Sequence, residues 1–223
     1  MSDPNAEAKK RAAEQAAAMV QSGMVVGLGT GSTAAFAVEA IGRRIAAGQL
    51  KDIRGVPTST RTLRQAEQLG IPLTSLNEVP RLDLTIDGAD EVDVAGDMIK
   101  GGGGALLWEK IVAAASARYV IVVDQAKVVG RLGARFPLPV EVVSFGWRTH
   151  LAAIEALGGA PTIRLEGDGK PYRSDEGHFI IDCRFSGGIA DARHVHDVLK
   201  RRAGVVETGL FLGFEPRVIV GGA

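Results

Sequence analysis

Cysteine is almost absent from this sequence, since Cys183 is the single one among 223 residues. One cysteine excludes an intramolecular disulfide, a CxxC redox pair and a thiolate metal site. Cys183 lies in the apolar stretch HFIIDCRF, which predicts a buried and unreactive thiol. The four histidines predict no metal site either, because His194 and His196 stand two positions apart on an expected helix and so point in different directions.

Excess charge of one sign and long apolar runs are also missing. The 26 basic residues balance 26 acidic ones, which excludes a broad electrostatic surface for DNA, RNA or an anionic membrane. A small anionic ligand remains compatible with this balance, since it needs only a local cluster of donors. No apolar run reaches the roughly 18 residues of a transmembrane helix, and the alanines around Glu7 and Lys9 form a helix pattern rather than a signal peptide. We therefore expect a cytoplasmic enzyme with no nucleic-acid or membrane partner.

Apolar segments alternate with helical ones in the first part of the chain. The expected strands lie in MVVGLG, IRGVPTS, LDLTIDGAD and RYVIVVD, and the expected helices cover about 6–20, 32–47, 60–70 and 105–117. Continuous apolar strands between helices are typical of a parallel sheet covered on both faces. In such sheets ligands bind at the carboxyl ends of the strands, so residues that directly follow a strand are the first candidates for a site.

The order of elements changes after about Gly133. PLPVEVV predicts a strand and FGWRTHLAAIEALGG a helix, PTIRL and HFIIDCRF predict a hairpin around Gly167 to Gly169, and a helix and the strand VVETGLFLG follow. This is the β-α-β-β-α-β order of a ferredoxin-like unit. We predict an α/β protein with a Rossmann-like, mostly parallel catalytic domain at 1–132, a smaller ferredoxin-like α+β domain at 133–207, and a C-terminal segment at 208–223 that returns to the catalytic domain.

The glycine-rich turn GLGTGSTAA follows the first expected strand. Small residues at a helix N-terminus expose backbone N–H groups that bind anions, and hydroxyls can add donors to phosphate oxygens. A dinucleotide fingerprint is excluded, because its third glycine would have to stand elsewhere. A tight turn with Ser32 as the helix N-cap remains an alternative. The candidate phosphate ligands are Thr30, Gly31, Ser32 and Thr33.

The acidic turn IDGADEVD follows the third expected strand. It supplies Asp87, Gly88, Ala89 and Asp90, whose small central residues let a ligand approach the backbone. Two neighbouring carboxylates can hold sugar hydroxyls, and one of them can act as an acid. A helix-capping turn is the alternative, as is a carboxylate-bound metal that would add the nearby Glu91, Asp93 and Asp97.

Four consecutive glycines stand in MIKGGGGALLWEK, and their conformational-entropy cost argues against a structural accident. Lys100 precedes them and can neutralise negative charge that develops on a substrate oxygen. Glu109 lies in the second turn of the following helix beside apolar neighbours, where burial favours a general base, although a surface glutamate remains an alternative. Lys127, after the fourth strand, is either a solvated charge or a further ligand for phosphate or sugar.

Taken together, these segments resemble ribose-5-phosphate isomerase of type A. The resemblance is carried, in the family's order, by GLGTGSTAAFAVEAIG, GVPTSTRT, LGIPL, LTIDGADEVD, MIKGGGGALLWEKIVAAAS, VVDQAKVVGRLG and FPLPVEVV. It implies an enzyme that interconverts ribose 5-phosphate and ribulose 5-phosphate without metal or organic cofactor, and a homodimer. Trp108 departs from the family pattern, in which arginine commonly precedes the glutamate, and Lys9 matches a lysine that helps to hold phosphate.

The resemblance also implies roles for the candidate residues. Glu109 is the base that moves a proton between C2 and C1, Lys100 stabilises the enediolate, and Asp87 moves protons between oxygens, with its share relative to Asp90 left open. The substrate site then comprises Thr30, Gly31, Ser32, Thr33, Asp87, Gly88, Ala89, Asp90, Lys100, Gly101, Gly102, Gly103 and Lys127. The alternatives are an aminosugar-phosphate deaminase, a coenzyme A transferase and a sugar-phosphate-sensing regulator. The regulator is disfavoured, because the sequence has neither a basic region nor room for a DNA-binding motif before Met24.

Overall fold

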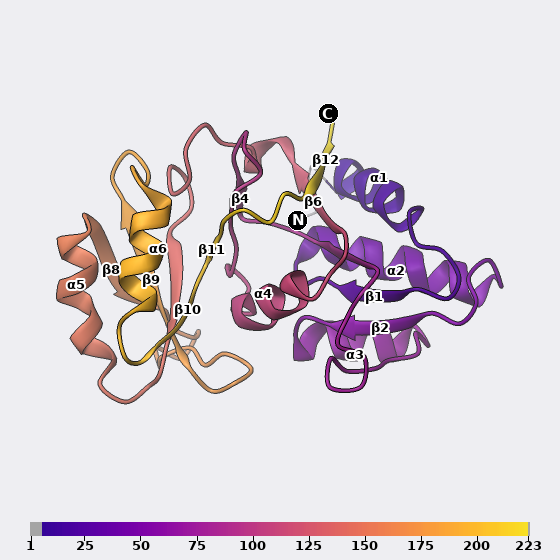
Figure 1. Cartoon of the computed structure of the whole chain (residues 1–223), viewed down its shortest axis with the longest axis horizontal. Helices are drawn as coiled ribbons and strands as arrows, with labels where there is room; N and C mark the ends of the chain where they lie inside the picture. The colour runs from indigo at the N-terminus through magenta and orange to yellow at the C-terminus, as the bar shows by residue number, and fades with distance from the viewer. Residues whose placement is uncertain (1–5, 223) are drawn as a thin grey trace. The chain divides into compact units, whose positions relative to one another are not determined.

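The computed structural model describes residues 6–222, which pack into two units (Figure 1). Of these residues, 6–89, 108–127 and 214–222 belong to the first unit, and Asp90–Leu107 and Val128–Gly213 belong to the second. The predicted boundaries at 132 and 207 correspond to 127 and 213 in this division, and residues 90–107, predicted in the catalytic domain, belong to the second unit. Two short strands in that segment pair with a third strand near residue 210, as described below.

The first unit is built on a parallel sheet of five strands, as the continuous apolar runs predicted. Its strands are β1 (Val25–Leu28), β2 (Arg54–Pro57), β3 (Leu84–Asp87), β6 (Tyr119–Asp124) and β12 (Arg217–Gly221). They lie in the order β12-β6-β3-β1-β2, and every neighbouring pair is parallel. The strand order reverses between β1 and β3, and this switch point is where open α/β sheets bind their ligands.

Helices cover both faces of this sheet. They are α1 (Ala6–Ala17), α2 (Ser32–Ala46), α3 (Thr60–Gln68) and α4 (Leu106–Ala114), and the one-turn helix η1 (Gln125–Lys127) follows β6. Side chains alternate along each strand, so Val26 and Leu28 pack with α1 and α2 while Val25 packs on the other face with Val112 of α4. Figure 1 shows α1 and α2 side by side, and buried alanines such as Ala13 and Ala16 let them approach closely.

Gly27 explains how closely α4 approaches the sheet. A Cβ atom at this position would lie 2.7 Å from Cγ1 of Val112, which is inside van der Waals contact. The missing side chain therefore lets the helix that carries Glu109 rest directly on β1.

The second unit contains the predicted ferredoxin-like arrangement. Its elements are β7 (Leu138–Val142), η2 (Trp147–His150), α5 (Leu151–Ala156), β8 (Gly159–Ile163), β9 (Phe179–Phe185), α6 (Ala192–Lys200) and β10 (Val205–Thr208). The antiparallel sheet has the order β10-β7-β9-β8, so the first and third strands of the motif lie in the centre. Cys183 of β9 is fully buried, and burial raises the pKa of its thiol, which confirms the predicted inert cysteine.

The second unit also has three strands of two residues each, of which two were not predicted and the third lies within the predicted strand VVETGLFLG. They are β4 (Glu91–Val92), β5 (Met98–Ile99) and β11 (Leu210–Phe211), and they form a separate antiparallel sheet in the order β11-β5-β4. The prediction of one strand over VVETGLFLG is therefore wrong at its centre, because the chain leaves β10 at Gly209. A Cβ atom on Gly209 would lie 2.8 Å from Cδ of Pro139, so only glycine lets the chain pass this close to Pro139 between β10 and β11.

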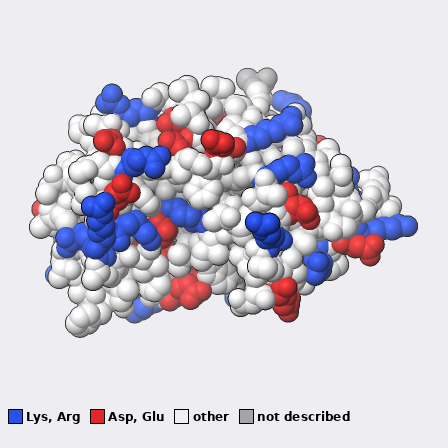
Figure 2. Space-filling view, viewed as in Figure 1, with Lys and Arg blue, Asp and Glu red and all other residues white. Residues whose placement is uncertain are grey.

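Two surface properties follow from the composition. Figure 2 shows basic and acidic side chains interspersed over the visible face, in line with the equal numbers of the two kinds. Among residues 6–222, no helix is both long enough and apolar enough to span a bilayer.

Candidate active site

The loop after β1 and the end of β3 are joined by hydrogen bonds at the switch point. The N–H of Gly29 donates to the carbonyl oxygen of Ile86 at 2.9 Å, and the N–H of Thr30 donates to Oδ1 of Asp87 at 3.0 Å. Asp87 is fully buried and also accepts the N–H of Gly88 at 2.7 Å. A Cβ atom on Gly29 would lie 2.5 Å from Cα of Asp87, so this close approach requires glycine. The structure thus brings together two of the predicted strand-end loops.

A buried cluster of four hydroxyls supports this loop from the side of α3. Oγ1 of Thr30 lies 2.8 Å from Oγ1 of Thr58, 2.7 Å from Oγ of Ser59 and 2.9 Å from Oγ1 of Thr62. Oγ1 of Thr62 also donates to the carbonyl oxygen of Gly29 at 3.0 Å. A hydroxyl offers one proton and two lone pairs, so the side chain of Thr30 is fully engaged within the protein. We call Thr30, Thr58, Ser59 and Thr62 the hydroxyl cluster.

The N-terminus of α2 is left open to a ligand. The helix begins at Ser32 with Gly31 as its N-cap, and no side chain caps it, so the alternative of Ser32 as N-cap is wrong. Ser32 is exposed and Thr33 is buried, and both lie in the first helical turn, whose N–H groups have no partner four residues earlier. Gly31 has φ 121°, which disfavours any other residue. These features suit an anion, as the glycine-rich turn predicted.

In the second unit, Asp90 and the glycine loop are joined. Oδ2 of Asp90 accepts the N–H of Gly102 at 2.7 Å, and the N–H of Lys100 donates to the carbonyl oxygen of Gly209 at 2.9 Å. The Lys100 side chain is 2% exposed, with Nζ 5.5 Å from the ring centroid of Phe211. We use the name glycine loop for residues 101–104. Within it Gly101 has φ 107° and Gly104 has φ 80°, which explains part of the glycine run.

Glu109 lies in α4 and is 5% exposed, so the alternative of a surface glutamate is wrong. Lys127 lies at the end of η1 and is partly exposed. The buried Asp124 ends β6 and accepts the N–H of Ala126 at 3.0 Å. Its Oδ2 is 3.5 Å from Nζ of Lys9, so β6 and α1 bring this lysine to the carboxyl edge of the sheet. Asp124 opens the segment 124–127, which the sequence placed at this edge of the sheet, but its ion pair with Lys9 was not predicted.

The acidic residues proposed as metal ligands hold loops instead. Glu91 is buried and accepts the N–H groups of Gly133, Arg135 and Phe136 at 2.5–2.7 Å. Oδ1 of Asp93 accepts backbone N–H groups within its own turn, and Oδ1 of Asp97 accepts that of Gly213. Over residues 6–222, no group of three or more His, Cys, Asp or Glu side chains is arranged to hold a metal ion.

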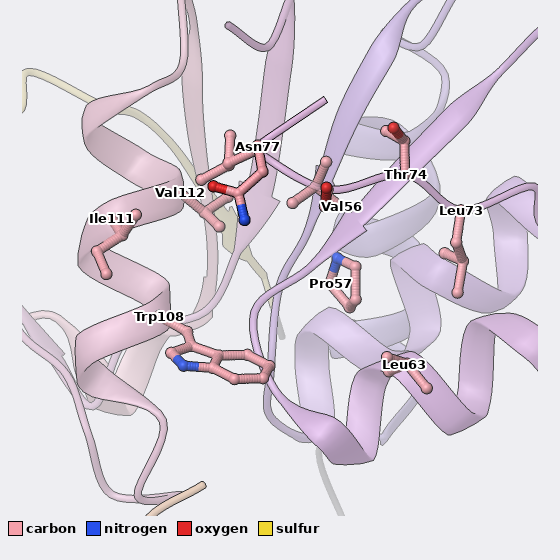
Figure 3. Close-up of a pocket in the computed structure, with 11 residues that line it drawn as sticks. Val56, Pro57, Leu63, Leu73, Thr74, Asn77, Trp108, Ile111 and Val112 are labelled. Carbon is pink, nitrogen blue, oxygen red and sulfur yellow. The ribbon is translucent and has the colours of Figure 1, made fainter. Parts of the chain in front are cut away.

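Trp108, the residue that departs from the family pattern, lines an apolar pocket of about 440 Å³ in the first unit (Figure 3). Figure 3 shows its indole reaching from α4 towards the side of the pocket that Pro57 and Leu63 form. The full lining is Val56, Pro57, Leu63, Leu73, Thr74, Ser75, Leu76, Asn77, Trp108, Ile111 and Val112. None of these residues is among the predicted substrate ligands.

Comparison with known proteins gives one result along nearly the whole chain. Residues 54–223 match the family model of ribose 5-phosphate isomerase A (phosphoriboisomerase A). The ribose-5-phosphate isomerase A of Synechococcus sp. (strain JA-3-3Ab) is 55% identical over 97% of this chain and 94% of its own length, and that of Chloroflexus aurantiacus is 51% identical over 96% and 89%.

Solved structures give the same answer. The ribose 5-phosphate isomerase A of Methanocaldococcus jannaschii superposes with a TM-score of 0.91 at 38% identity, covering 98% of this chain and 96% of that one. A D-ribose-5-phosphate isomerase in complex with phospho-erythronic acid superposes with a TM-score of 0.93 at 36% identity, covering 96% and 94%. The chain therefore belongs to the ribose 5-phosphate isomerase A family.

Proposed function

We propose that the two loops joined at the switch point, together with Glu109 and the glycine loop, carry out the reaction of this family on this chain. Ribose-5-phosphate isomerase A interconverts ribose 5-phosphate and ribulose 5-phosphate in the pentose phosphate pathway, and this chain is an isomerase of that family. The observation that carries the assignment of residues is the pair of hydrogen bonds from Gly29 to Ile86 and from Thr30 to Asp87. These bonds join the two loops beside an open helix N-terminus.

Glu109 is the general base of the proposed mechanism. In the open-chain aldose, the aldehyde at C1 acidifies the proton on C2, and the Glu109 carboxylate removes it. The electron pair of the C2–H bond forms a C1–C2 double bond, and the negative charge moves to O1. Glu109, now protonated, returns the proton to C1 while the carbonyl forms at C2. A buried carboxylate suits this task, because desolvation raises the proton affinity of a base.

Two other groups complete the proton and charge transfers. The ammonium of Lys100 stabilises the enediolate oxygen, and its deep burial makes that stabilisation stronger than in water. A proton must also pass from O2 to O1, and Asp87 is the proposed carrier because its position is fixed by two backbone N–H groups. Asp90, already bonded to the glycine loop, is proposed to hold sugar hydroxyls.

The phosphate is proposed to bind at the N-terminus of α2, through the N–H groups and hydroxyls of Ser32 and Thr33 and the ammonium of Lys127. Binding energy from this remote group orients C1 and C2 against the base. A phosphorylated sugar acid bound to a structurally similar isomerase supports a site of this kind. The carboxylate of such an acid spreads its charge over two oxygens, as an enediolate does.

The test is an isomerisation assay with ribose 5-phosphate on the wild type and on Glu109→Gln. We expect the variant to bind substrate with a similar KM and to lose about 10³-fold in kcat, within the range that a positioned base supplies. Glu67→Gln, an exposed glutamate of α3 in the same unit, is the matched control and should retain full activity. Near-wild-type turnover of Glu109→Gln would remove this residue from its proposed role.

Parallel assays with other substrates separate the rival functions. Release of ammonia from glucosamine 6-phosphate would indicate a deaminase, and transfer of coenzyme A from an acyl thioester to a free carboxylate would indicate a transferase. We also propose that the reaction needs no metal or organic cofactor. Loss of activity in EDTA that Mg²⁺ restores would contradict this independence.

A homodimer and a cytoplasmic location are further proposals. Light scattering during gel filtration tests the first, since a mass near twice the 23.4 kDa of one chain is expected. Cell fractionation tests the second. A relative from Arabidopsis thaliana that is 48% identical is named chloroplastic, so similarity to this family does not by itself indicate the compartment.

A further inference from the structure

Arg164, the residue that directly follows β8, binds the backbone of the glycine loop. Its Nη1 donates to the carbonyl oxygen of Gly101 at 2.8 Å and to that of Gly102 at 3.2 Å. The other edge of the guanidinium faces Asp182 on β9, with Nε 2.9 Å from Oδ2 and Nη2 2.5 Å from Oδ1. All of these residues belong to the second unit.

The sheet holds this guanidinium in one orientation. Two parallel hydrogen bonds to a carboxylate fix the plane of an arginine, and lysine cannot reproduce them. The side chains of Arg164 and Asp182 are 14% and 24% exposed, so solvent screens the ion pair only in part. The N–H of Arg164 donates to the carbonyl oxygen of Ile180 at 2.8 Å, which continues the pairing of β8 with β9. The orientation of the side chain is therefore set by the second sheet.

Tyr172 closes the glycine loop from the same side. Its ring lies 5.8 Å from the Arg164 guanidinium, and its hydroxyl donates to the carbonyl oxygen of Gly103 at 3.4 Å. A Cβ atom on Gly104 would lie 2.6 Å from the Tyr172 ring, so the loop fits against this residue only as glycine. Three successive carbonyl groups of the glycine loop thus face Arg164 and Tyr172.

In a trans peptide unit the C=O and N–H groups point in opposite directions. The peptide between Gly101 and Gly102 shows this directly, because its oxygen accepts from Arg164 while its N–H donates to Asp90 at 2.7 Å. In the next peptide the carbonyl oxygen of Gly102 also faces Arg164, so the N–H of Gly103 points to the side of the Asp90 carboxylate. This is the side on which the proposed function puts the sugar.

Holding these peptide groups in one orientation costs conformational entropy, because the loop consists of glycines. A glycine peptide can rotate to either sign of φ with little steric penalty, so a run of four has many alternative conformations. If the peptide at Gly101 rotated, a carbonyl oxygen would face the developing enediolate in place of an N–H group. Repulsion would then replace stabilisation in the transition state.

From this geometry we propose that Arg164, anchored by Asp182, is a positioning residue of the isomerase site that keeps the N–H groups of the glycine loop directed at the substrate oxygens. It acts through the loop and does not touch the substrate. The proposal rests on the proposed function, because the reaction supplies the charge that those N–H groups stabilise.

The test compares Arg164→Ala with the matched control Arg173→Ala by steady-state isomerisation of ribose 5-phosphate. Arg173 lies in the same β8–β9 connection and makes contacts of the same kinds, donating to the carbonyl oxygen of Gly177 at 2.9 Å and stacking on Phe179 at 5.0 Å. We expect Arg164→Ala to lower kcat by about 10- to 100-fold, less than loss of a whole oxyanion donor, because the loop is loosened and not removed. The control should match the wild type.

Two further measurements separate positioning from packing. Guanidinium chloride on the order of 50 mM, far below unfolding concentrations, should restore part of the kcat of Arg164→Ala, and NaCl at equal ionic strength should not. Asp182→Asn keeps the side-chain shape but removes the anchoring charge, and it should lower kcat in the same direction by about threefold to tenfold. This second variant decides the question if thermal unfolding shows that Arg164→Ala does not fold.

Wild-type kcat in folded Arg164→Ala or Asp182→Asn would overturn the proposal. So would a fall in kcat that guanidinium leaves unchanged, since that result would trace the loss to packing of the β8–β9 connection. A wild type without isomerase activity would instead contradict the proposed function. The two failures are therefore distinguishable.

Discussion

The hydroxyl cluster makes a quantitative prediction at Thr62. Thr62→Val removes one hydroxyl and replaces it with a methyl group of similar size, so neither a cavity nor a change of backbone is expected. The N-cap of α3 is spared, because the Thr62 N–H that donates to Oγ of Ser59 is retained. The change therefore isolates the hydrogen bonds of a single oxygen atom.

The magnitude follows from the partners of that oxygen. The buried carbonyl of Gly29 loses its Thr62 donor, and an unsatisfied buried acceptor costs about 1–3 kcal/mol. Thr30 keeps its contacts with Thr58 and Ser59, so the loss on its side is smaller, about 0.5 kcal/mol. We expect a loss of about 2 kcal/mol in the free energy of unfolding, which in a chain of this size lowers Tm by about 4–8 °C.

Thermal unfolding monitored by circular dichroism measures this change, and Thr62→Ser is the control that keeps the hydroxyl. Because the Gly29 carbonyl belongs to the loop that holds Asp87, the KM for ribose 5-phosphate should rise in Thr62→Val and stay close to wild type in Thr62→Ser. The reasoning is refuted if Thr62→Val unfolds within about 1 °C of the wild type, or if the serine variant loses as much stability as the valine variant.

Two other predictions come from close packing and from burial of charge. Gly29→Ala puts a methyl group against Asp87, so it should destabilise the chain by about 1–3 kcal/mol and abolish tight substrate binding. Gly130→Ala is the control, because a Cβ atom there meets nothing within 4 Å, and it should match the wild type in unfolding and kinetics. Burial raises the pKa of the Glu141 carboxyl above its usual 4.5, so the folded chain binds that proton more tightly than the unfolded chain and stability falls as pH rises from 4.5 towards the raised pKa. In Glu141→Gln, the free energy of unfolding should depend less on pH across this window than in the wild type. An unchanged pH dependence would contradict the assignment of this effect to Glu141.

The main architecture was predictable because its signals are local. Continuous apolar runs between helices indicated the parallel sheet, and the change of element order after Gly133 indicated the ferredoxin-like unit. The strands β4 and β5 and the break between β10 and β11 escaped prediction, because strands of two residues carry no periodicity. Their pairing joins segments more than a hundred positions apart and moves residues 90–107 into the second unit.

The candidate site was predictable to a different extent. Placement after a strand was enough to expect Asp87 beside the glycine-rich turn, since carboxyl ends of parallel strands share one edge of a sheet. The supports of that site could not be predicted in the same way. Thr62 lies 33 positions from Gly29, and Arg164 lies 63 positions from Gly101. In the sequence, nothing distinguishes either residue from an ordinary polar side chain.

The single cysteine gives this protein an internal chemical reporter. Cys183 lies in the middle of β9, fully buried, and its raised pKa keeps the thiol protonated and unreactive in the folded chain. A thiol reagent can therefore react only while β9 is open, and no second thiol adds background. Cys183 lies next to Asp182, the residue on β9 that anchors Arg164. The rate at which a reagent labels Cys183 in the wild-type protein therefore measures how often the sheet that orients Arg164 opens.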